Sequence, residues 1–152
     1  MREMFSLIKE NIESGNDIVL VSIIGDFGSA PRGAGAHMLV TRKGRIYGTI
    51  GGGAVEYQSE KLAAEALNEG RSLIKAFILE QNQIEDIGMI CGGNVLVIFQ
   101  YISAEDDQGI GEICDEALAM LDKDEDAWMV CELLDDDSWQ MGLYSESAGL
   151  IG

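Results

Sequence analysis

Three glycine-rich segments of the chain carry residue types that could bind an anionic ligand or a soft metal. In the first, Gly28 and Ser29 precede Pro31 and Arg32. Glycine permits a tight turn, proline stiffens the chain, and a guanidinium presents a planar set of donors that suits a phosphate or carboxylate. A surface loop with a solvated arginine is the competing interpretation of this segment.

The second segment contains Gly51, Gly52 and Gly53, followed by Glu56. Three residues without a Cβ let a bulky ligand approach the backbone, and amides at the start of a helix favour an anionic group. Glu56 could cap backbone donors at this helix start, or it could face a ligand as a proton acceptor. Capping is the more economical role, but three glycines cost conformational entropy and indicate more than a simple turn.

The third segment places Cys91 beside Gly92 and Gly93. Nearby donors can lower the pKa of such a thiol, which can then bind a soft metal or carry sulfur. A lone cysteine is more often a small apolar filler. Cys114 and Cys131 lie in helical and strand patterns, which predict inert filling roles for both.

The hydrophobic pattern predicts the elements that hold these segments. Apolar residues at helical spacing predict a helix over residues 4–12, and the Val- and Ile-rich run 17–25 predicts a buried strand. Residues 26–35 are then expected to form a loop. Strands over 36–41 and 45–50 flank a short turn with glycine, which is typical of a hairpin.

The run of three glycines therefore lies between a strand and a helix. Helical spacing from Val55 onwards, with Gly70 in the position of a C-terminal stop, predicts that helix. Further strands are predicted over residues 72–79 and 94–101, and the polar connection between them ends in the Cys91 segment.

The C-terminal part of the chain repeats the order of the N-terminal part, because a helical pattern over residues 113–121 precedes another strand. Alignment of the two parts pairs Asp17 with Asp126 and residues 48–51 with 149–152. This suggests a degenerate internal repeat of helix, strand, loop and hairpin. A chance similarity between two ordinary segments is the alternative.

Strands that come in hairpin pairs between helices predict an α+β fold, with a mixed β-sheet covered by flanking helices. The sequence lacks the glycine fingerprints of dinucleotide-binding and P-loop proteins, so a classical Rossmann fold is not expected. A length of 152 residues with 47% apolar side chains predicts a single domain over residues 1–152, which includes the acidic tail 104–152.

The formal charge of −17 is unevenly distributed, with 12 acidic and 9 basic residues through Ser103 and 15 acidic and 1 basic residue after it. A negative field disfavours binding to nucleic acid and to anionic lipid. The acidic tail is explained by solubility, or by docking to a basic partner. Three distant cysteines and one histidine argue against a disulfide framework or a zinc site, and the absence of a signal or membrane segment predicts a cytoplasmic protein.

Taken together, GSAPRGAGAHMLV, GRIYGTIGGGAVE and GMICGGNVLVIFQY resemble the signature of the XdhC/CoxI family, the accessory factors of xanthine dehydrogenase and related molybdenum hydroxylases. The resemblance covers residues 7–102 well and the tail loosely. It implies a chaperone that binds molybdenum cofactor (molybdopterin), shields it, aids its sulfuration by a cysteine desulfurase and delivers it to the apo-hydroxylase. Such a protein is a maturation factor and not an enzyme, although a direct part in sulfur transfer stays open.

The same resemblance implies that all three segments bind the cofactor, with Cys91 in contact with molybdenum or the transferred sulfur. Two departures from the family matter: Ala54 stands where many members have a cysteine, and the Rossmann-like domain of many members is missing, so a separate partner chain could supply it. The implied cofactor-binding residues are Gly28, Ser29, Pro31, Arg32, Gly51, Gly52, Gly53, Glu56, Cys91, Gly92 and Gly93.

Two other functions stay open. A small regulatory module that binds a phosphate, pterin or nucleotide would use the same glycine segments without needing Cys91, and a structural partner of a hydroxylase complex would use the acidic tail. We also expect a homodimer, because a closing hairpin leaves an open sheet edge. The apolar residues expected to be exposed there are Met141, Leu143, Tyr144, Leu150 and Ile151.

Overall fold

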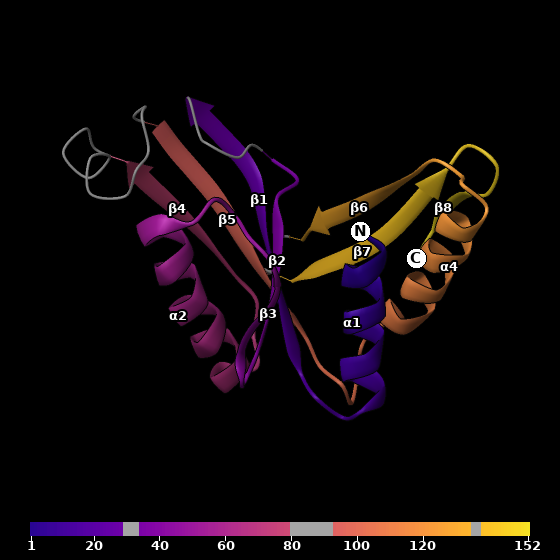
Figure 1. Cartoon of the computed structure of the whole chain (residues 1–152), viewed down its shortest axis with the longest axis horizontal. Helices are drawn as coiled ribbons and strands as arrows, with labels where there is room; N and C mark the ends of the chain where they lie inside the picture. The colour runs from indigo at the N-terminus through magenta and orange to yellow at the C-terminus, as the bar shows by residue number, and fades with distance from the viewer. Residues whose placement is uncertain (29–33, 80–92, 135–137) are drawn as a thin grey trace. The chain divides into compact units, whose positions relative to one another are not determined.

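The computed structural model describes residues 1–28, 34–79, 93–134 and 138–152. The described residues fall into two compact units, unit 1 with Met1–Ile18 and Ile102–Gly152, and unit 2 with Val19–Tyr101. The helices are α1 (Arg2–Glu13), α2 (Gly53–Glu69) and α4 (Ile110–Asp122), and the strands are β1 (Ile18–Gly28), β2 (His37–Thr41), β3 (Gly44–Gly48), β4 (Leu73–Leu79), β5 (Gly93–Ile102), β6 (Ala127–Leu133), β7 (Trp139–Ser145) and β8 (Gly149–Ile151) (Figure 1).

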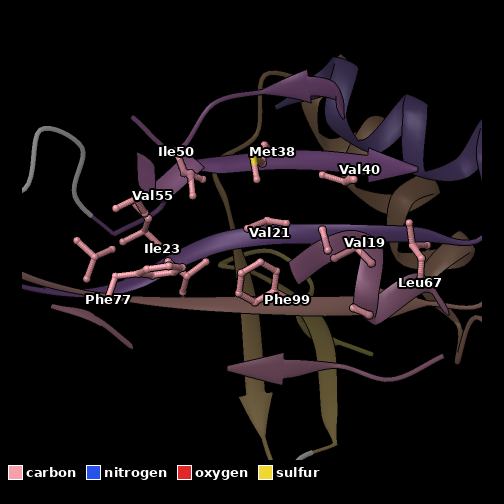
Figure 2. Packing of buried hydrophobic residues seen from close by; sticks show 14 residues of the cluster. Val19, Val21, Ile23, Met38, Val40, Ile50, Val55, Leu67, Phe77 and Phe99 are labelled. Atoms are coloured by element: carbon pink, nitrogen blue, oxygen red, sulfur yellow. The ribbon is translucent and has the colours of Figure 1, made fainter. Parts of the chain in front are cut away.

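Unit 2 is a five-stranded sheet, in the order β3-β2-β1-β5-β4, with α2 against one face. Alternate residues of the central strand β1 point into one apolar core, because side chains along a strand alternate between the two faces of a sheet. Figure 2 shows Val19, Val21 and Ile23 of β1 in this core, together with Phe99 of β5 and Leu67 of α2. The core therefore fixes α2, and with it the glycine loop that precedes α2, against the sheet.

Gly48 ends the hairpin of β2 and β3, and its position requires a glycine. Its φ is +71°, and an added Cβ would lie 2.2 Å from the backbone oxygen of His37 on the neighbouring strand. A side chain at residue 48 would therefore strain the backbone and push the two strands apart. The close approach holds the end of β3 in register just before the glycine loop.

Unit 1 is a three-stranded sheet, in the order β6-β7-β8, together with α1 and α4. The two helices pack against each other, and α4 packs on β7. Ion pairs join Arg2 to Asp122 (2.6 Å) and Lys9 to Asp115 along the α1–α4 contact. These pairs are largely exposed and add little to stability, so the packing of apolar side chains holds the helices together. The buried side chains are Met4, Phe5 and Ile8 of α1 and Ile110, Ile113, Cys114, Ala117 and Met120 of α4.

The closing hairpin differs from its sequence-based prediction. Met141 and Leu143, expected to be exposed, are buried, and Ile151 is half-buried. The expectation treated every apolar residue of the hairpin alike, whereas β7 alternates between a covered and an exposed face. Only Tyr144 and Leu150 are largely exposed. The homodimer stays a prediction, with less exposed apolar surface to support it.

The order of helix and three strands occurs twice, as α1-β1-β2-β3 and as α4-β6-β7-β8, and in each copy the three strands are neighbours in sequence order. The expected pairing of Asp17 with Asp126 holds, since each directly precedes the first strand of its copy. The pairing of residues 48–51 with 149–152 is wrong. Gly48 ends β3 whereas Gly149 begins β8, so Gly149 corresponds to Gly44, which begins β3.

The turns of the two hairpins support this corrected correspondence. Thr41 pairs with Gly44 in the ladder, and its hydroxyl accepts a hydrogen bond from the amide of Lys43 at 3.2 Å. Ser145 pairs with Gly149, and its hydroxyl accepts one from the amide of Ala148 at 3.1 Å. Both turns are thus closed by a hydroxyl residue at the end of one strand and a glycine at the start of the next.

The α+β class with hairpins and flanking helices is confirmed. Where the sequence predicts one mixed sheet, the described strands form two sheets, and each pairing with a defined register is antiparallel. β1 continues to Gly28 and takes over the start of the predicted loop 26–35, while the predicted strand 45–50 ends at Gly48. The single domain stays a prediction. None of the described helices has the length and apolar character needed to cross a membrane.

Candidate functional site

The glycine loop between β3 and α2 has a backbone that only glycine adopts easily. Gly51, Gly52 and Gly53 have φ angles of +125°, +77° and +66°. Three successive residues in this region would strain any other side chain. An added Cβ at Gly52 would have no atom of another residue within 4 Å, so the space beside this glycine is open.

The carboxylate of Glu56 organises the loop from the first turns of α2. Its Oε2 accepts hydrogen bonds from the amides of Ile50 (3.0 Å) and Gly52 (2.9 Å) and from the hydroxyl of Thr49. Its Oε1 pairs with Nη1 of Arg45 at 2.7 Å. Glu56 is only 8% exposed, so these contacts replace almost all of its water.

These contacts also decide the charge of Glu56. Burial alone raises the pKa of a carboxyl group, but the hydrogen bonds from Thr49, Gly52 and Ile50 and the charge of Arg45 together hold the pKa of Glu56 below its ordinary value. Glu56 is therefore ionised at neutral pH. Of its two predicted roles, the contacts favour capping over proton acceptance.

Arg45 is the second organising residue of the loop. Besides its pair with Glu56, it donates from Nη1 to the backbone oxygen of Gly48 at 2.9 Å and pairs through Nε with Glu60 at 2.9 Å. It thereby joins the end of β3 to two successive turns of α2. Sequence reasoning missed Arg45, Thr49 and Glu60. The spacing of Glu56 and Glu60, one helical turn apart, was a signal for a shared cationic partner.

The loop offers a ligand fewer free donors than the sequence suggests. The amides of Ile50 and Gly52 bond to Glu56, and the amide of Gly51 bonds to the hydroxyl of Thr49 at 3.1 Å. What the loop offers is an open backbone surface at Gly52 and the adjoining start of α2, where first-turn amides have no acceptor within the helix.

The other two predicted segments adjoin unit 2 at neighbouring strands. Gly28 is the last residue of β1, and Gly93 is the first residue of β5. Figure 1 shows the end of β1, the start of β5 and the start of α2 at the same end of unit 2. The described parts of all three segments thus lie toward the same end of the sheet. Ser29, Pro31, Arg32, Cys91 and Gly92 lie outside the described residues.

The histidine and the two described thiols are not among the residues that form the hydrogen bonds of the glycine loop described above. His37 Nδ1 lies 2.8 Å from the hydroxyl of Ser22, and burial lowers the pKa of His37. Cys114 is buried, which raises the pKa of its thiol to about 12 and agrees with an inert filler. Cys131 is exposed, so its predicted filling role is wrong. Within the described ranges, no three His, Cys, Asp or Glu side chains gather in a way that could hold a metal ion.

Comparison with known proteins yields a match to part of the chain and a similar fold. Residues 12–77 match the model of the XdhC and CoxI family, a stretch that includes the glycine loop, Arg45 and Glu56. The crystal structure of a xanthine dehydrogenase from Bacillus halodurans is similar over 97% of this chain and 44% of that chain, with a TM-score of 0.72. At 18% identity, this similarity supports the fold alone.

Two proteins of Escherichia coli (strain K12) are similar in sequence. The uncharacterized protein YqeB is 34% identical over 85 residues, which are 56% of this chain and 16% of YqeB. The molybdenum cofactor insertion chaperone PaoD is 33% identical over 94 residues, which are 62% of this chain and 29% of PaoD. This chain thus matches less than a third of either relative. Over residues 12–77, less than half of its length, the chain is similar to the XdhC and CoxI family.

Proposed function

We propose that this protein is a maturation factor of molybdenum hydroxylases, which binds molybdenum cofactor and assists its sulfuration and insertion into a xanthine dehydrogenase-type apoenzyme. The family match over residues 12–77 carries the proposal, because it includes the whole described glycine loop. The relative PaoD, a molybdenum cofactor insertion chaperone, supports it. In this role the protein handles a cofactor and has no substrate of its own to turn over.

One feature of unit 2 supports the binding of a bulky ligand. The open space beside Gly52 lets a ligand approach the backbone, since no other residue lies within 4 Å of an added Cβ. Glu56 does not repel an anionic arm strongly, because Arg45 neutralises its charge. The loop amides are mostly occupied, so we assign the loop the role of shaping the site, and we assign Arg32 and the start of α2 the role of holding a phosphate.

The Cys91 segment would supply the thiolate that can bind a soft metal or carry sulfur. Gly93 begins β5 at the end of the sheet that also carries the glycine loop. We propose that Cys91, two residues before Gly93 in the sequence, is the thiolate that contacts molybdenum or the sulfur supplied by a cysteine desulfurase. Ala54 has no such chemistry, so Cys91 acts without a second thiol from the glycine loop. A separate Rossmann-like chain is a further proposed partner.

The test is to purify the protein anaerobically from a host that makes molybdopterin and to measure bound molybdenum and pterin fluorescence. Gly52→Ala and Gly15→Ala form a matched pair, because both glycines have similar φ angles (+77° and +74°) and open space around the Cβ position. We expect similar stability losses in both variants but less bound cofactor only in Gly52→Ala.

Other results would favour other functions. Pterin without metal supports a regulatory module, and neither pterin nor metal supports a structural partner of the hydroxylase. Equal cofactor content in Gly52→Ala and wild type would show that the glycine loop is not part of the cofactor site. Cys91→Ala should keep the pterin but fail to deliver sulfurated cofactor, whereas Cys114→Ala should deliver it normally.

A further inference from the structure

The outer surface of the sheet in unit 1 carries a group of exposed apolar side chains, Trp128, Val130, Tyr144 and Leu150, which we call the aromatic face. Their exposed fractions are 51%, 39%, 43% and 64%. An antiparallel sheet with one covered face normally presents polar residues on the other. Here the second face carries these four apolar side chains beside the polar Glu132 and Gln140.

The four side chains form one continuous surface. Trp128 lies opposite Tyr144 in the ladder, and their ring centroids are 5.8 Å apart. Tyr144 in turn lies opposite Leu150. Leu150 lies over Gly142, where an added Cβ would be 3.1 Å from its Cδ1, and Gly142 lies opposite Val130. The four side chains therefore lie on one face across all three strands.

This surface is distinct from the packed side of the same sheet. Met141 and Leu143 alternate with Gly142 and Tyr144 along β7 and are buried. α4 packs on β7, and Ile113 is among its buried side chains. Since α4 covers that side, the exposed residues of the aromatic face are not part of the core of unit 1.

The charge of the chain is concentrated in the unit that carries this face. Unit 1 contains 19 acidic and 3 basic residues, a net charge of −16, whereas unit 2 contains 8 acidic and 7 basic residues, a net charge of −1. Glu132 follows Trp128 and Val130 at alternate positions of β6 and is exposed. The face is thus an apolar patch on a strongly acidic unit, with Glu132 beside it, and an apolar centre with a polar rim is typical of protein interfaces.

The negative charge of unit 1 indicates which class of partner binds the aromatic face. A second copy would bring a like charge of −16 against it, and like charges across an interface are costly. Nucleic acid and anionic lipid are repelled for the same reason. We propose that the aromatic face docks a partner protein that presents an apolar surface with a basic rim, with Trp128 and Tyr144 as the aromatic anchors that commonly dominate such interfaces.

The partner in the test is the one named in the proposed function, a molybdenum hydroxylase apoenzyme, so the choice of probe rests on that function. Trp128 can report docking, because the chain has two tryptophans and Trp139 is buried. In a Trp139→Phe variant, we expect the emission of Trp128 to shift to shorter wavelength when the apoenzyme is added. Affinity in the wild type should fall at least tenfold between low and physiological salt.

Two exposed-strand substitutions complete the test without relying on the reporter variant. Leu150→Thr should weaken binding of the apoenzyme at least tenfold, and Ile78→Thr, an equally exposed apolar residue on β4, should leave it unchanged. Thermal unfolding of each variant shows whether the fold is kept. If Leu150→Thr unfolds the protein, the milder Val130→Thr takes its place.

Several results would overturn the inference. These are wild-type affinity in Leu150→Thr, a complex that leaves the emission of Trp128 unchanged, or a blue-shifted Trp128 in the protein alone, which would mean that the chain covers this face itself. A shift that depends on protein concentration would assign the face to a second copy. If cofactor binds but no apoenzyme complex forms, the docking inference fails and cofactor binding stands. If the apoenzyme complex forms but no cofactor binds, the docking inference stands and the cofactor-binding proposal fails.

Discussion

The carboxylate of Glu56 accepts hydrogen bonds from backbone amides that a glycine loop usually offers to a ligand. The amides of Ile50 and Gly52 turn inward to it, and Arg45 balances its charge. The loop is therefore preorganised before any ligand arrives. Preorganisation lowers the conformational cost of binding, and we expect it to be the main contribution of Glu56 to the site.

Glu56→Gln should reduce stability at neutral pH and remove part of its acid dependence. The folded-state pKa of Glu56 lies below the ordinary value of 4.5, so its contribution is full above that value and is lost as pH falls through the folded pKa. Hydrogen bonds to a charged group contribute about 1.5–3 kcal/mol, which sets the expected loss at pH 7. Urea unfolding from pH 7 to pH 3 measures it, and a loss that stays the same at every pH would contradict an ionised Glu56.

Gly48→Ala should destabilise the protein more than Gly15→Ala. Both residues have a φ close to +70°, where a Cβ costs roughly 1–2 kcal/mol. Only at Gly48 does the Cβ also meet the oxygen of His37, at 2.2 Å. We expect an additional loss of about 2 kcal/mol from overpacking in Gly48→Ala. Chemical denaturation of both variants checks this, and equal losses would show that the strands separate without cost.

At this scale the sequence reveals backbone requirements better than side-chain partners. Gly51 to Gly53 could be singled out because a glycine run has few explanations other than an unusual backbone. The role of Arg45 could not be predicted, since its contacts join a hairpin to a helix and exist only in the folded chain. The capping role of Glu56 was one of two possibilities until its contacts were known.

At the scale of elements, periodicity predicts the helices and strands, while their ends depend on neighbours. α2 ends where Gly70 predicts, because Gly70 adopts the left-handed conformation of a helix stop. β1 runs past its predicted end at Gly25 to Gly28, although its ladder with β2 covers only Val19 to Ser22, and it neighbours β5 on its other side. Residue types at positions 26–28 carry no sign of this extension.

The two described thiols should react at very different rates, because α4 and β6 place them differently. Cys114 is buried and its thiol has a pKa of about 12, whereas Cys131 is exposed on β6. Since only the thiolate reacts, iodoacetamide at pH 8 should label Cys131 within minutes and Cys114 only after denaturant is added. Mass spectrometry of the labelled peptides is the measurement. Rapid labelling of Cys114 in the native protein would mean that α4 opens readily.

At the scale of the whole molecule, the charge difference between the units predicts a response to salt. Carboxylates crowd unit 1, and their repulsion opposes its folding at low ionic strength. Salt shortens the reach of this repulsion from about 30 Å at 0.01 M to about 10 Å at 0.1 M.

Sodium chloride should therefore raise the melting temperature. Relief of about 1 kcal/mol corresponds to roughly 2–4 °C for a chain of this size. Scanning calorimetry at 10 and 200 mM salt measures the shift. A melting temperature that falls with salt would show that the ion pairs between α1 and α4 outweigh the repulsion.

The division into two units is the feature that sequence reasoning did not anticipate. A hydrophobic pattern indicates that α1 has one apolar face but does not say which element covers that face. The order along the chain suggests β1, which follows directly, yet α1 packs with α4, almost a hundred residues later. Unit 1 is therefore built from two distant stretches of sequence, with all of unit 2 inserted between them.

This insertion has a consequence for synthesis on the ribosome. The apolar face of α1, with Met4, Phe5 and Ile8, emerges first, but its partner α4 follows only after residue 110. At translation rates of about 5–20 residues per second, the wait lasts roughly 5–20 seconds. Residues 19–101 emerge during that time and can form their own contacts. The nascent chain thus exposes the apolar face of α1 while unit 2 assembles, which makes α1 a segment that a general chaperone would bind during synthesis.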